Sequence, residues 1–316
     1  MKYYFIINPV SGQGKSAESL RAQIREACAE KGVDAQIFET QGVRDAEVIA
    51  AQIAKELNGE EATIWACGGD GTAGEVVNGI VGHPNIIFGV IPTGTGNDMI
   101  RNFGLPQEAF LNIKAQLEGS PQTMDLMQYT GVIDGVQETR YCGNMFNNGF
   151  DCNVVDATAK LKTYPLISGS LAYLLGVASM FIKKKGISLK IYADGELVST
   201  GPILLCAIAN GSFCGGGICS SPQAIINDGL MDLNIIGDTT RRRFIKLFPS
   251  YTKGTHLNRE DARDIISTYA CKEVRLLPDG TDDFLFCADG ETARTTGLTI
   301  TMCPGALRIQ VPAVPE

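Results

Sequence analysis

The fold is decided by the stretch Ala62-Thr63-Ile64-Trp65-Ala66-Cys67-Gly68-Gly69-Asp70-Gly71-Thr72. Its first six residues predict a short buried strand, and the residues from Thr72 onward predict a helix. The three glycines allow a sharp turn and let the main chain approach a ligand closely. The start of the helix attracts anions through its free N–H groups and its dipole. Asp70 would repel a phosphate there, so it indicates an intervening cation or a sugar hydroxyl, with an ordinary glycine turn as the alternative.

Two further loops of similar composition follow predicted strands. Strand 3–7 leads into Asn8-Pro9-Val10-Ser11-Gly12-Gln13-Gly14-Lys15-Ser16, and strand 86–91 leads into Pro92-Thr93-Gly94-Thr95-Gly96-Asn97-Asp98. The first loop is not a P-loop, because Pro9 stands where that motif requires a glycine. Three such loops at three strand ends predict one polyanionic ligand, most simply a nucleotide.

Strand and helix patterns alternate from residue 1 to about 127. The predicted strands lie near 3–7, 33–38, 62–67 and 86–91, and the predicted helices near 16–31, 44–57 and 72–81. This order predicts an α/β domain with a doubly wound, mostly parallel sheet that binds ligands at the carboxyl ends of its strands.

The pattern changes after Met124 and predicts a second, antiparallel domain over residues 128–305. Hairpin signals occur at Asp134-Gly135 and Asp194-Gly195. Helical stretches are expected at about 153–184 and 241–268. Strands are expected at 186–192, 202–209, 230–236, 272–277, 284–288 and 306–311.

Composition describes an ordinary globular protein. The 316 residues are 44% hydrophobic and 20% charged, and the net charge of −8 argues against nucleic acid as a partner. Ten cysteines without a Cys-x-x-Cys pair, and only two histidines, exclude a common zinc motif. The N-terminus shows no signal peptide, so a reduced, cytoplasmic setting is expected. The sequence leaves the oligomeric state open, a homodimer included.

One segment, residues 163–182, is uncharged and long enough to cross a membrane. Its glycines, proline and serines dilute that signal, and an apolar stripe instead predicts an amphipathic helix ending at Lys183-Lys184-Lys185. Such a helix would lie at a membrane surface or pack on the second domain. The stripe comprises Leu171, Leu174, Leu175, Ala178 and Ile182.

Seven motifs, taken in order, resemble those of the soluble diacylglycerol kinase family, which includes sphingosine, ceramide and bacterial lipid kinases. The resemblance runs through the whole chain. Its carriers are Asn8-Pro9-x-Ser11-Gly12, Gly68–Thr72, Gly94-Thr95-Gly96-Asn97-Asp98, Met124-Asp125, Asn148-Gly149-Phe150-Asp151, Asp228-Gly229-Leu230 and Asp289-Gly290-Glu291.

The resemblance implies an ATP-dependent kinase that phosphorylates a lipid hydroxyl, such as that of diacylglycerol, at a membrane surface. It also implies a second domain built as a β-sandwich and a C-terminal tail, about 306–316, that returns to the first domain. The expected nucleotide contacts are Asn8, Pro9, Ser11, Gly12, Thr40, Gly68, Gly69, Asp70, Gly71, Thr72, Gly94, Thr95, Asn97 and Asp98.

Carboxylates must supply metal binding and proton transfer, because both histidines lie outside every motif. Asp70, Asp98 and Asp125 follow or lie at strand ends and are expected to converge on Mg²⁺; for Asp98, a helix cap is the alternative. In the resembled family, Asp289-Gly290-Glu291 carries the general base, first Asp289 and second Glu291, although the sequence alone also fits a hairpin turn.

A second, structural Mg²⁺ is implied by the resemblance. Its expected ligands are the Asp228 carboxylate and the main-chain carbonyls of Ile225 and Leu230. Two other functions stay open: an NAD kinase-like enzyme, which would share Gly68–Thr72 but lack the first and last motifs, and a non-catalytic nucleotide- or lipid-binding regulator.

Overall fold

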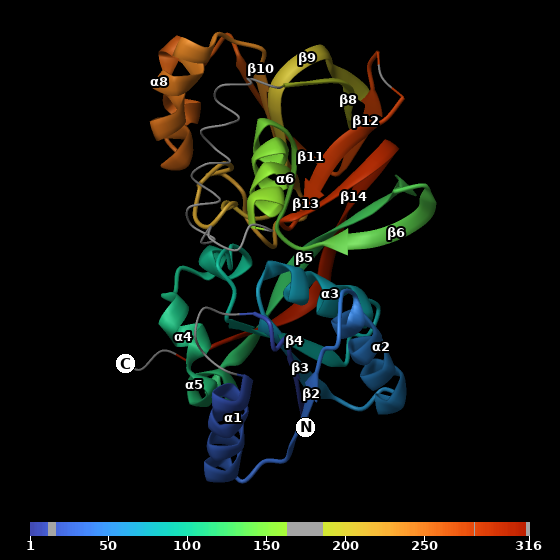
Figure 1. The fold of residues 1–316 in the computed structure, drawn as a ribbon, viewed down its shortest axis with the longest axis vertical. Helices are drawn as coiled ribbons and strands as arrows, with labels where there is room; N and C mark the ends of the chain where they lie inside the picture. The colour runs from blue at the N-terminus through green and yellow to red at the C-terminus, as the bar shows by residue number, and fades with distance from the viewer. Residues whose placement is uncertain (12–16, 163–185, 281, 314–316) are drawn as a thin grey trace. The chain divides into compact units, whose positions relative to one another are not determined.

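The structure, a computed structural model, describes residues 1–11, 17–162, 186–280 and 282–313. The chain divides into two compact units, which are described separately (Figure 1). Unit 1 comprises Met1–Leu126 and Pro304–Glu316, and unit 2 comprises Met127–Cys303. The boundaries expected from the sequence were residues 127 and 305.

Unit 1 is built on a parallel sheet whose strands pair in the order β2–β1–β3–β4. The end of β14 adds a parallel partner to β4, with Ile309 opposite Phe88. Each predicted strand and helix of this region is present. The elements are β1 Lys2–Ile7, α1 Ala17–Lys31, β2 Ala35–Glu39, α2 Asp45–Leu57, β3 Ala62–Gly68, α3 Asp70–Ile80, β4 Ile86–Pro92, η1 Met99–Phe103, α4 Gln107–Leu111 and α5 Ile113–Glu118.

Helices cover both faces of this sheet, α1 on one side and α2 with α3 on the other (Figure 1). Side chains alternate along each strand, so Phe5 and Trp65 point to the α1 face, where their rings stack with centroids 4.6 Å apart. Gly89 on β4 leaves room for the indole, because a Cβ there would lie 2.2 Å from Trp65. Burial on both faces keeps the four strands, and hence their carboxyl ends, in fixed register.

Unit 2 is rich in antiparallel strands. The pairings run β9–β7–β13–β14–β12–β8 and return to β9, so this part of the sheet closes on itself around one apolar core. β10 and β11 extend from β9, while β5 and β6 extend from β14. The strands are β5 Ser120–Ile133, β6 Val136–Cys142, β7 Met145–Gly149, β8 Ile187–Ala193, β9 Glu196–Ala209, β10 Met231–Gly237, β11 Ile266–Cys271, β12 Glu273–Pro278, β13 Phe284–Ala288 and β14 Glu291–Val311.

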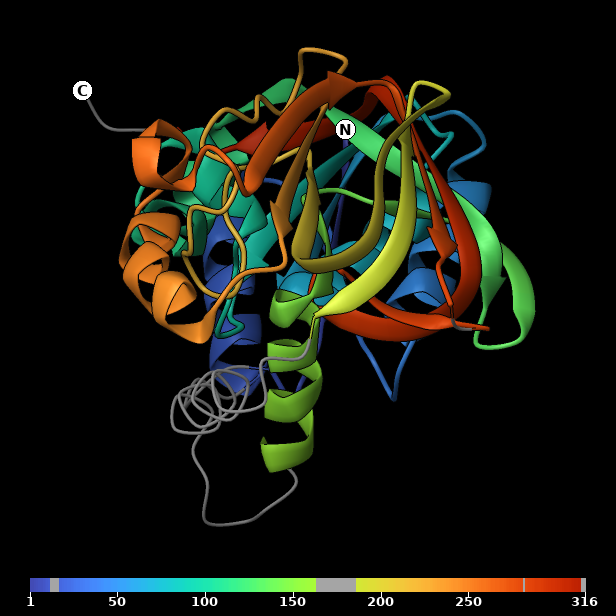
Figure 2. The same ribbon diagram turned by 90° about the horizontal axis from the view of Figure 1, so that it is seen from above.

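The helices of unit 2 correct the sequence prediction in part. α6, Phe150–Lys162, is the light-green helix in Figure 2 and begins three residues before the predicted insertion. The rest of that insertion, 163–184, lies outside the described residues. The predicted helical stretch 241–268 is not one helix, because α8, Arg241–Thr252, is followed by Gly254 at φ +72°. Two short 3-10 helices come next, η2 His256–Asn258 and η3 Glu260–Ala262. The prediction is wrong from Ile266, where β11 begins and pairs with β10.

None of the helices that the structure describes combines the length and the apolarity needed to cross a bilayer. The stretch 163–182, which raised the question in the sequence, is outside the described ranges.

Candidate functional site

The three glycine-containing loops of unit 1 are joined directly to one another at the carboxyl ends of the parallel strands. Asn8 donates from Nδ2 to Thr72 Oγ1 at 3.0 Å, which ties the first loop to the second. Thr93 donates from Oγ1 to Ser11 Oγ at 3.2 Å, which ties the third loop to the first. The N–H groups of Thr93 and Gly94 both donate to the carbonyl of Gly68. The loops that the sequence predicted to share one ligand therefore form one cluster.

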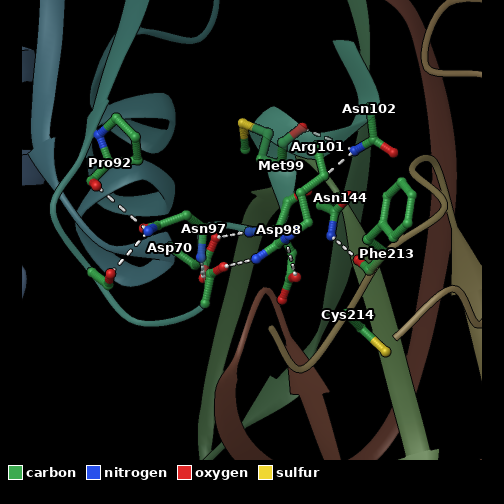
Figure 3. A network of polar contacts seen from close by, with 12 residues as sticks. Asp70, Pro92, Asn97, Asp98, Met99, Arg101, Asn102, Asn144, Phe213 and Cys214 are labelled. Atoms are coloured by element: carbon green, nitrogen blue, oxygen red, sulfur yellow. Dashed lines mark hydrogen bonds and ion pairs between the residues drawn. The ribbon is translucent and has the colours of Figure 1, made fainter. Parts of the chain in front are cut away.

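Asp70 connects the second loop to the third (Figure 3). Its Oδ2 accepts the N–H of Asn97 at 2.8 Å, and its Oδ1 accepts the N–H of Asp98 at 2.9 Å. Asn97 has φ +53° and is buried, and its Nδ2 donates to the carbonyl of Gly94 at 2.8 Å. Two main-chain N–H groups thus donate hydrogen bonds to the Asp70 carboxylate and stabilise its charge. No cation is needed to explain why a carboxylate occupies this loop.

The glycines of this cluster allow the second and third loops to touch. A Cβ on Gly94 would lie 2.4 Å from the Cα of Gly69, and one on Gly96 would lie 2.5 Å from Oδ2 of Asp70. Both distances are far inside van der Waals contact. Close packing of one loop on the other is therefore the physical reason for these two glycines.

The start of α3 provides donors for an anion. The cap residue, Gly69, has no side chain that could accept the first-turn N–H groups. Within the described ranges, the N–H groups of Gly71 and Thr72 have no acceptor. Nearby, Asn97 Oδ1 is buried with no hydrogen-bond partner in those ranges. This donor-rich helix start fits a phosphate.

The remaining predicted nucleotide contacts take different positions around the loop cluster. Asp98 is buried at the N-cap position of η1, but its side chain makes no capping hydrogen bond and pairs with Arg101 Nε at 3.3 Å. Thr40 is buried after β2, where its N–H donates to Ile7 at 3.0 Å. Pro9 and Thr95 are exposed. Gly12 lies outside the described residues.

Asp125 lies on β5 and is held by the returning C-terminal segment of unit 1. Its Oδ1 accepts the N–H of Gly305, a residue at φ +64°, at 2.6 Å. Across the described part of the chain, no group of three or more His, Cys, Asp or Glu side chains is arranged to hold a metal. The sequence led us to expect that Asp70, Asp98 and Asp125 converge on Mg²⁺. Among the described residues they do not form a metal-binding group.

In unit 2, Asp289 occupies the tip of the β13–β14 hairpin. Ala288 pairs with Glu291 across a two-residue turn, so the hairpin interpretation of this motif is confirmed. The Asp289 carboxylate accepts three main-chain N–H groups, from Gly143 at 2.8 Å, Asn144 at 3.1 Å and Met145 at 2.9 Å. It therefore anchors the segment that joins β6 to β7.

Two opposing effects act on the pKa of Asp289. Burial raises this pKa, while the main-chain donors and the neighbouring Cys142 thiol lower it, and the net shift is upward. The side chain remains partly exposed. Glu291, the second candidate base, is exposed at the first residue of β14.

Unit 2 contains two other hairpins built in the same way. Asp134, Asp194 and Asp289 all precede a glycine and have φ values of +46°, +47° and +45°. Asp134 Oδ1 accepts the N–H of Arg294 at 2.9 Å, and Asp194 Oδ1 accepts two N–H groups from residues 272 and 273 at 2.9 Å each. An Asp-Gly turn whose carboxylate binds the main chain of a neighbouring strand is thus a recurrent structural device of this unit.

The residues of the implied structural metal site lie close together in sequence before β10. Asp228 is exposed, and its Oδ1 accepts the N–H of Leu230 at 3.0 Å. Ile225 is 54% exposed. Burial and the charge of Asp228 raise the pKa of Asp232 to about 6. No cation-binding group is assembled here among the described residues.

Sequence reasoning missed several residues that position the site. Thr93 and Arg101 hold Ser11 and Asp98, but neither belongs to a pattern that predicts such a contact. Glu75 of α3 accepts the N–H groups of Arg44 and Ala46 at the start of α2. Arg44 was expected inside that helix, yet its φ of +63° places it before the helix. The contacts of Thr93 and Glu75 join segments far apart in the chain, so local patterns do not reveal them. Arg101 and Asp98 are only three residues apart, a spacing at which side chains on a helix can meet.

Family models match both parts of the chain. Residues 2–129 match the family model described as the diacylglycerol kinase catalytic domain. Residues 144–311 match the YegS C-terminal NAD kinase beta sandwich-like domain. The fold is similar to that of a crystal structure of a putative diacylglycerol kinase from Bacillus anthracis, with a TM-score of 0.72, 20% identity, and coverage of 98% of this chain and 96% of the other.

Curated relatives extend along most of the chain. A Bacillus subtilis diacylglycerol kinase is 31% identical over 256 residues, which are 80% of this chain and 79% of the relative. A Mycobacterium tuberculosis diacylglycerol kinase is 28% identical and covers 97% of this chain and 94% of its own length. A probable YegS-like lipid kinase of Klebsiella pneumoniae is 29% identical, with 96% and 94% covered. Since family models match both halves and the relatives span both units, this chain belongs to the diacylglycerol kinase family of lipid kinases.

Proposed function

We propose that this protein transfers the γ-phosphate of ATP to the free hydroxyl of diacylglycerol or of a related lipid alcohol. The observation that carries the proposal is the loop cluster of unit 1, in which Asn8 binds Thr72, Thr93 binds Ser11, and Asp70 binds the third loop. Such a cluster at the carboxyl ends of parallel strands is where α/β sheets bind nucleotides. The acceptor is inferred from the diacylglycerol kinases among the relatives.

In this proposal the loop cluster holds the phosphates. The N–H groups of Gly71 and Thr72 donate to phosphate oxygens at the start of α3, and Asp70 keeps the third loop in place behind them. We also propose a requirement for Mg²⁺, which neutralises phosphate charge during phosphoryl transfer. The described carboxylates assemble no metal-binding group, so we assign no step to the metal.

The acceptor hydroxyl needs a proton acceptor. The oxygen of the lipid hydroxyl forms a bond to the γ-phosphorus while the bond from the γ-phosphorus to the β,γ-bridging oxygen breaks. The proton of the hydroxyl passes to a carboxylate, and ADP leaves. We assign that carboxylate to Asp289, whose raised pKa favours proton uptake, with Glu291 as the alternative. The substrate resides in a bilayer, so we further propose that the protein acts at the cytoplasmic surface of a membrane.

A product assay tests the proposal. Purified protein is incubated with radiolabelled ATP and one acceptor in each reaction, with and without Mg²⁺. The acceptors are dispersed diacylglycerol, ceramide, sphingosine, monoacylglycerol and NAD. We expect labelled phosphatidic acid that requires added Mg²⁺. Phosphorylated NAD in place of a lipid product would support the NAD kinase-like alternative, and nucleotide binding without any product would support a regulator.

A further inference from the structure

Helix α8 presents two chemically different faces. Its inner face buries Phe244, Leu247 and Tyr251 against the core of unit 2. Tyr251 also donates a hydrogen bond to Asp151 of α6, so this face is fixed in the fold. The outer face is an arc of about 140° at 3.6 residues per turn. It carries the exposed residues Arg241, Arg242, Ile245, Lys246 and Pro249, which we call the α8 basic face.

The three cations of the α8 basic face are not neutralised by the protein. No carboxylate in the described ranges pairs with Arg241, Arg242 or Lys246. By contrast, Arg243, which points to the side, pairs with Asp264, and Arg259 pairs with Asp261. Asp264 and Asp261, two acidic residues near α8, therefore pair with other cations.

This local charge opposes that of the whole chain. Residues 241–264 contain seven Lys or Arg and three Asp or Glu, a net charge of +4, whereas the whole chain has −8. An acidic protein gains no general attraction to an anionic surface, so any such attraction must come from a local patch. Ile245 lies between these cations on the helix and is 55% exposed. A basic helix face with an exposed aliphatic side chain among its cations is typical of helices that lie on anionic bilayers.

We propose that the α8 basic face docks this protein on anionic phospholipid, with Arg241, Arg242 and Lys246 at the headgroups and Ile245 at the boundary with the acyl chains. The proposal rests on the proposed function, because a kinase of a bilayer lipid must reach the bilayer. It concerns a different element from the Lys183-Lys184-Lys185 segment, which lies outside the described residues. α8 stays folded on its inner face, so docking needs no rearrangement of unit 2.

The test is vesicle binding without ATP or diacylglycerol. Co-sedimentation is measured with phosphatidylglycerol–phosphatidylcholine vesicles and with phosphatidylcholine vesicles, for the wild type and for R241Q/R242Q/K246Q. A matched control, R25Q/K55Q/K272Q, removes the same charge from three exposed cations that form no ion pair among the described residues. A fourth variant, I245S, removes only the aliphatic contact.

We expect the α8 triple variant to bind anionic vesicles more weakly, about fivefold for each cation and on the order of 10²-fold in total, and the control to bind like the wild type. Wild-type binding should weaken with salt, and I245S should lower affinity several-fold at every salt concentration. Equal losses in both triple variants, or none in either, would overturn the proposal. So would a triple variant that turns a dimer into a monomer by light scattering while binding vesicles normally, because the face would then join two copies.

A second readout separates this proposal from the proposed function. Kinase activity is measured on a short-chain, water-soluble diacylglycerol, which requires no membrane. The α8 triple variant should keep wild-type activity on that substrate and lose activity only on vesicles. If the wild type itself fails on the soluble substrate, the proposed function fails, while the vesicle-binding result still decides the role of α8.

Discussion

Replacing Asp289 by asparagine separates proton acceptance from structural anchoring. Asparagine has nearly the shape of aspartate, but it has no charge and presents an NH₂ group where one oxygen stood. In the structure both oxygens accept main-chain N–H groups, Oδ2 from Gly143 and Oδ1 from Asn144 and Met145. The substitution therefore turns one hydrogen bond into a donor–donor contact and weakens the others.

The size of the effect follows from these contacts. A hydrogen bond to a charged group contributes about 1.5–3 kcal/mol. Burial disfavours the charged form of Asp289 and raises its pKa. Removing the charge therefore also removes this unfavourable desolvation, which offsets part of the lost hydrogen-bond energy. We expect the Asp289→Asn variant to lose about 1–3 kcal/mol of unfolding free energy, or about 3–10 °C in Tm for a unit of this size. If Asp289 is also the base, kcat should fall by about 10²–10⁴-fold with little change in ATP affinity.

Asp194 provides the matched control. It occupies the same turn position, at φ +47°, and accepts two main-chain N–H groups. Asp194→Asn should lower Tm without a specific loss of kcat. Thermal unfolding and steady-state kinetics, measured well below both melting temperatures, give the two quantities for each variant. The base assignment is refuted if the kcat of Asp289→Asn stays within a few-fold of the kcat of Asp194→Asn. The same measurements on Glu291→Gln would then test the alternative base.

Four further outcomes are expected. Gly94→Ala should force the glycine loops apart, because its Cβ would lie 2.4 Å from the Cα of Gly69, and should weaken binding of an ATP analogue at least tenfold. Gly74→Ala is the control, because the space around Gly74 in α3 is open. This variant should raise the free energy of unfolding by about 0.5–1 kcal/mol, as denaturant unfolding will show. Asp228→Ala should abolish any rise of Tm with added Mg²⁺; an equal rise in both proteins removes the structural metal. Burial raises the pKa of Asp151 from 3.8 to about 6, so the wild type loses stability as pH rises through that range and the buried carboxyl ionises. Between pH 4 and pH 7, the free energy of unfolding of Asp151→Asn should therefore rise by about 2–3 kcal/mol relative to that of the wild type. Parallel stability–pH curves for the two proteins would contradict this.

Local signals were sufficient for unit 1. Strands β1, β3 and β4 are short apolar runs, and the helices α1 to α3 follow strands with a regular period. The predicted strands 3–7, 33–38, 62–67 and 86–91 therefore lie close to β1 to β4. Parallel crossovers then place all the loops at one edge of the sheet. The cross-loop bonds, such as Asn8 to Thr72, could not be predicted because they depend on side-chain placement across 64 residues.

Unit 2 was harder for a physical reason. Its strands are stabilised by partners far away in sequence, and the residues that form the start of β11 were included in the predicted helical stretch 241–268. β9 and β14 each pair with different strands along their length, which a sequence pattern cannot show. The three Asp-Gly hairpin turns of unit 2 were the exception. A two-residue turn between two strands needs positive φ at both positions, and Asp-Gly adopts such values readily.

The motif aspartates show why sequence resemblance assigns a site more readily than a role. Asp70, Asp125 and Asp289 each use a carboxylate oxygen to hold a main-chain N–H of another segment in the same unit. Truncating any of them to alanine leaves those N–H groups without their acceptor, at about 1–3 kcal/mol each where they are buried. Lost activity in such a variant would follow equally from displaced loops and from missing chemistry. A catalytic role for these residues can therefore be assigned only when an isosteric asparagine variant stays folded, still binds ATP, and loses kcat alone.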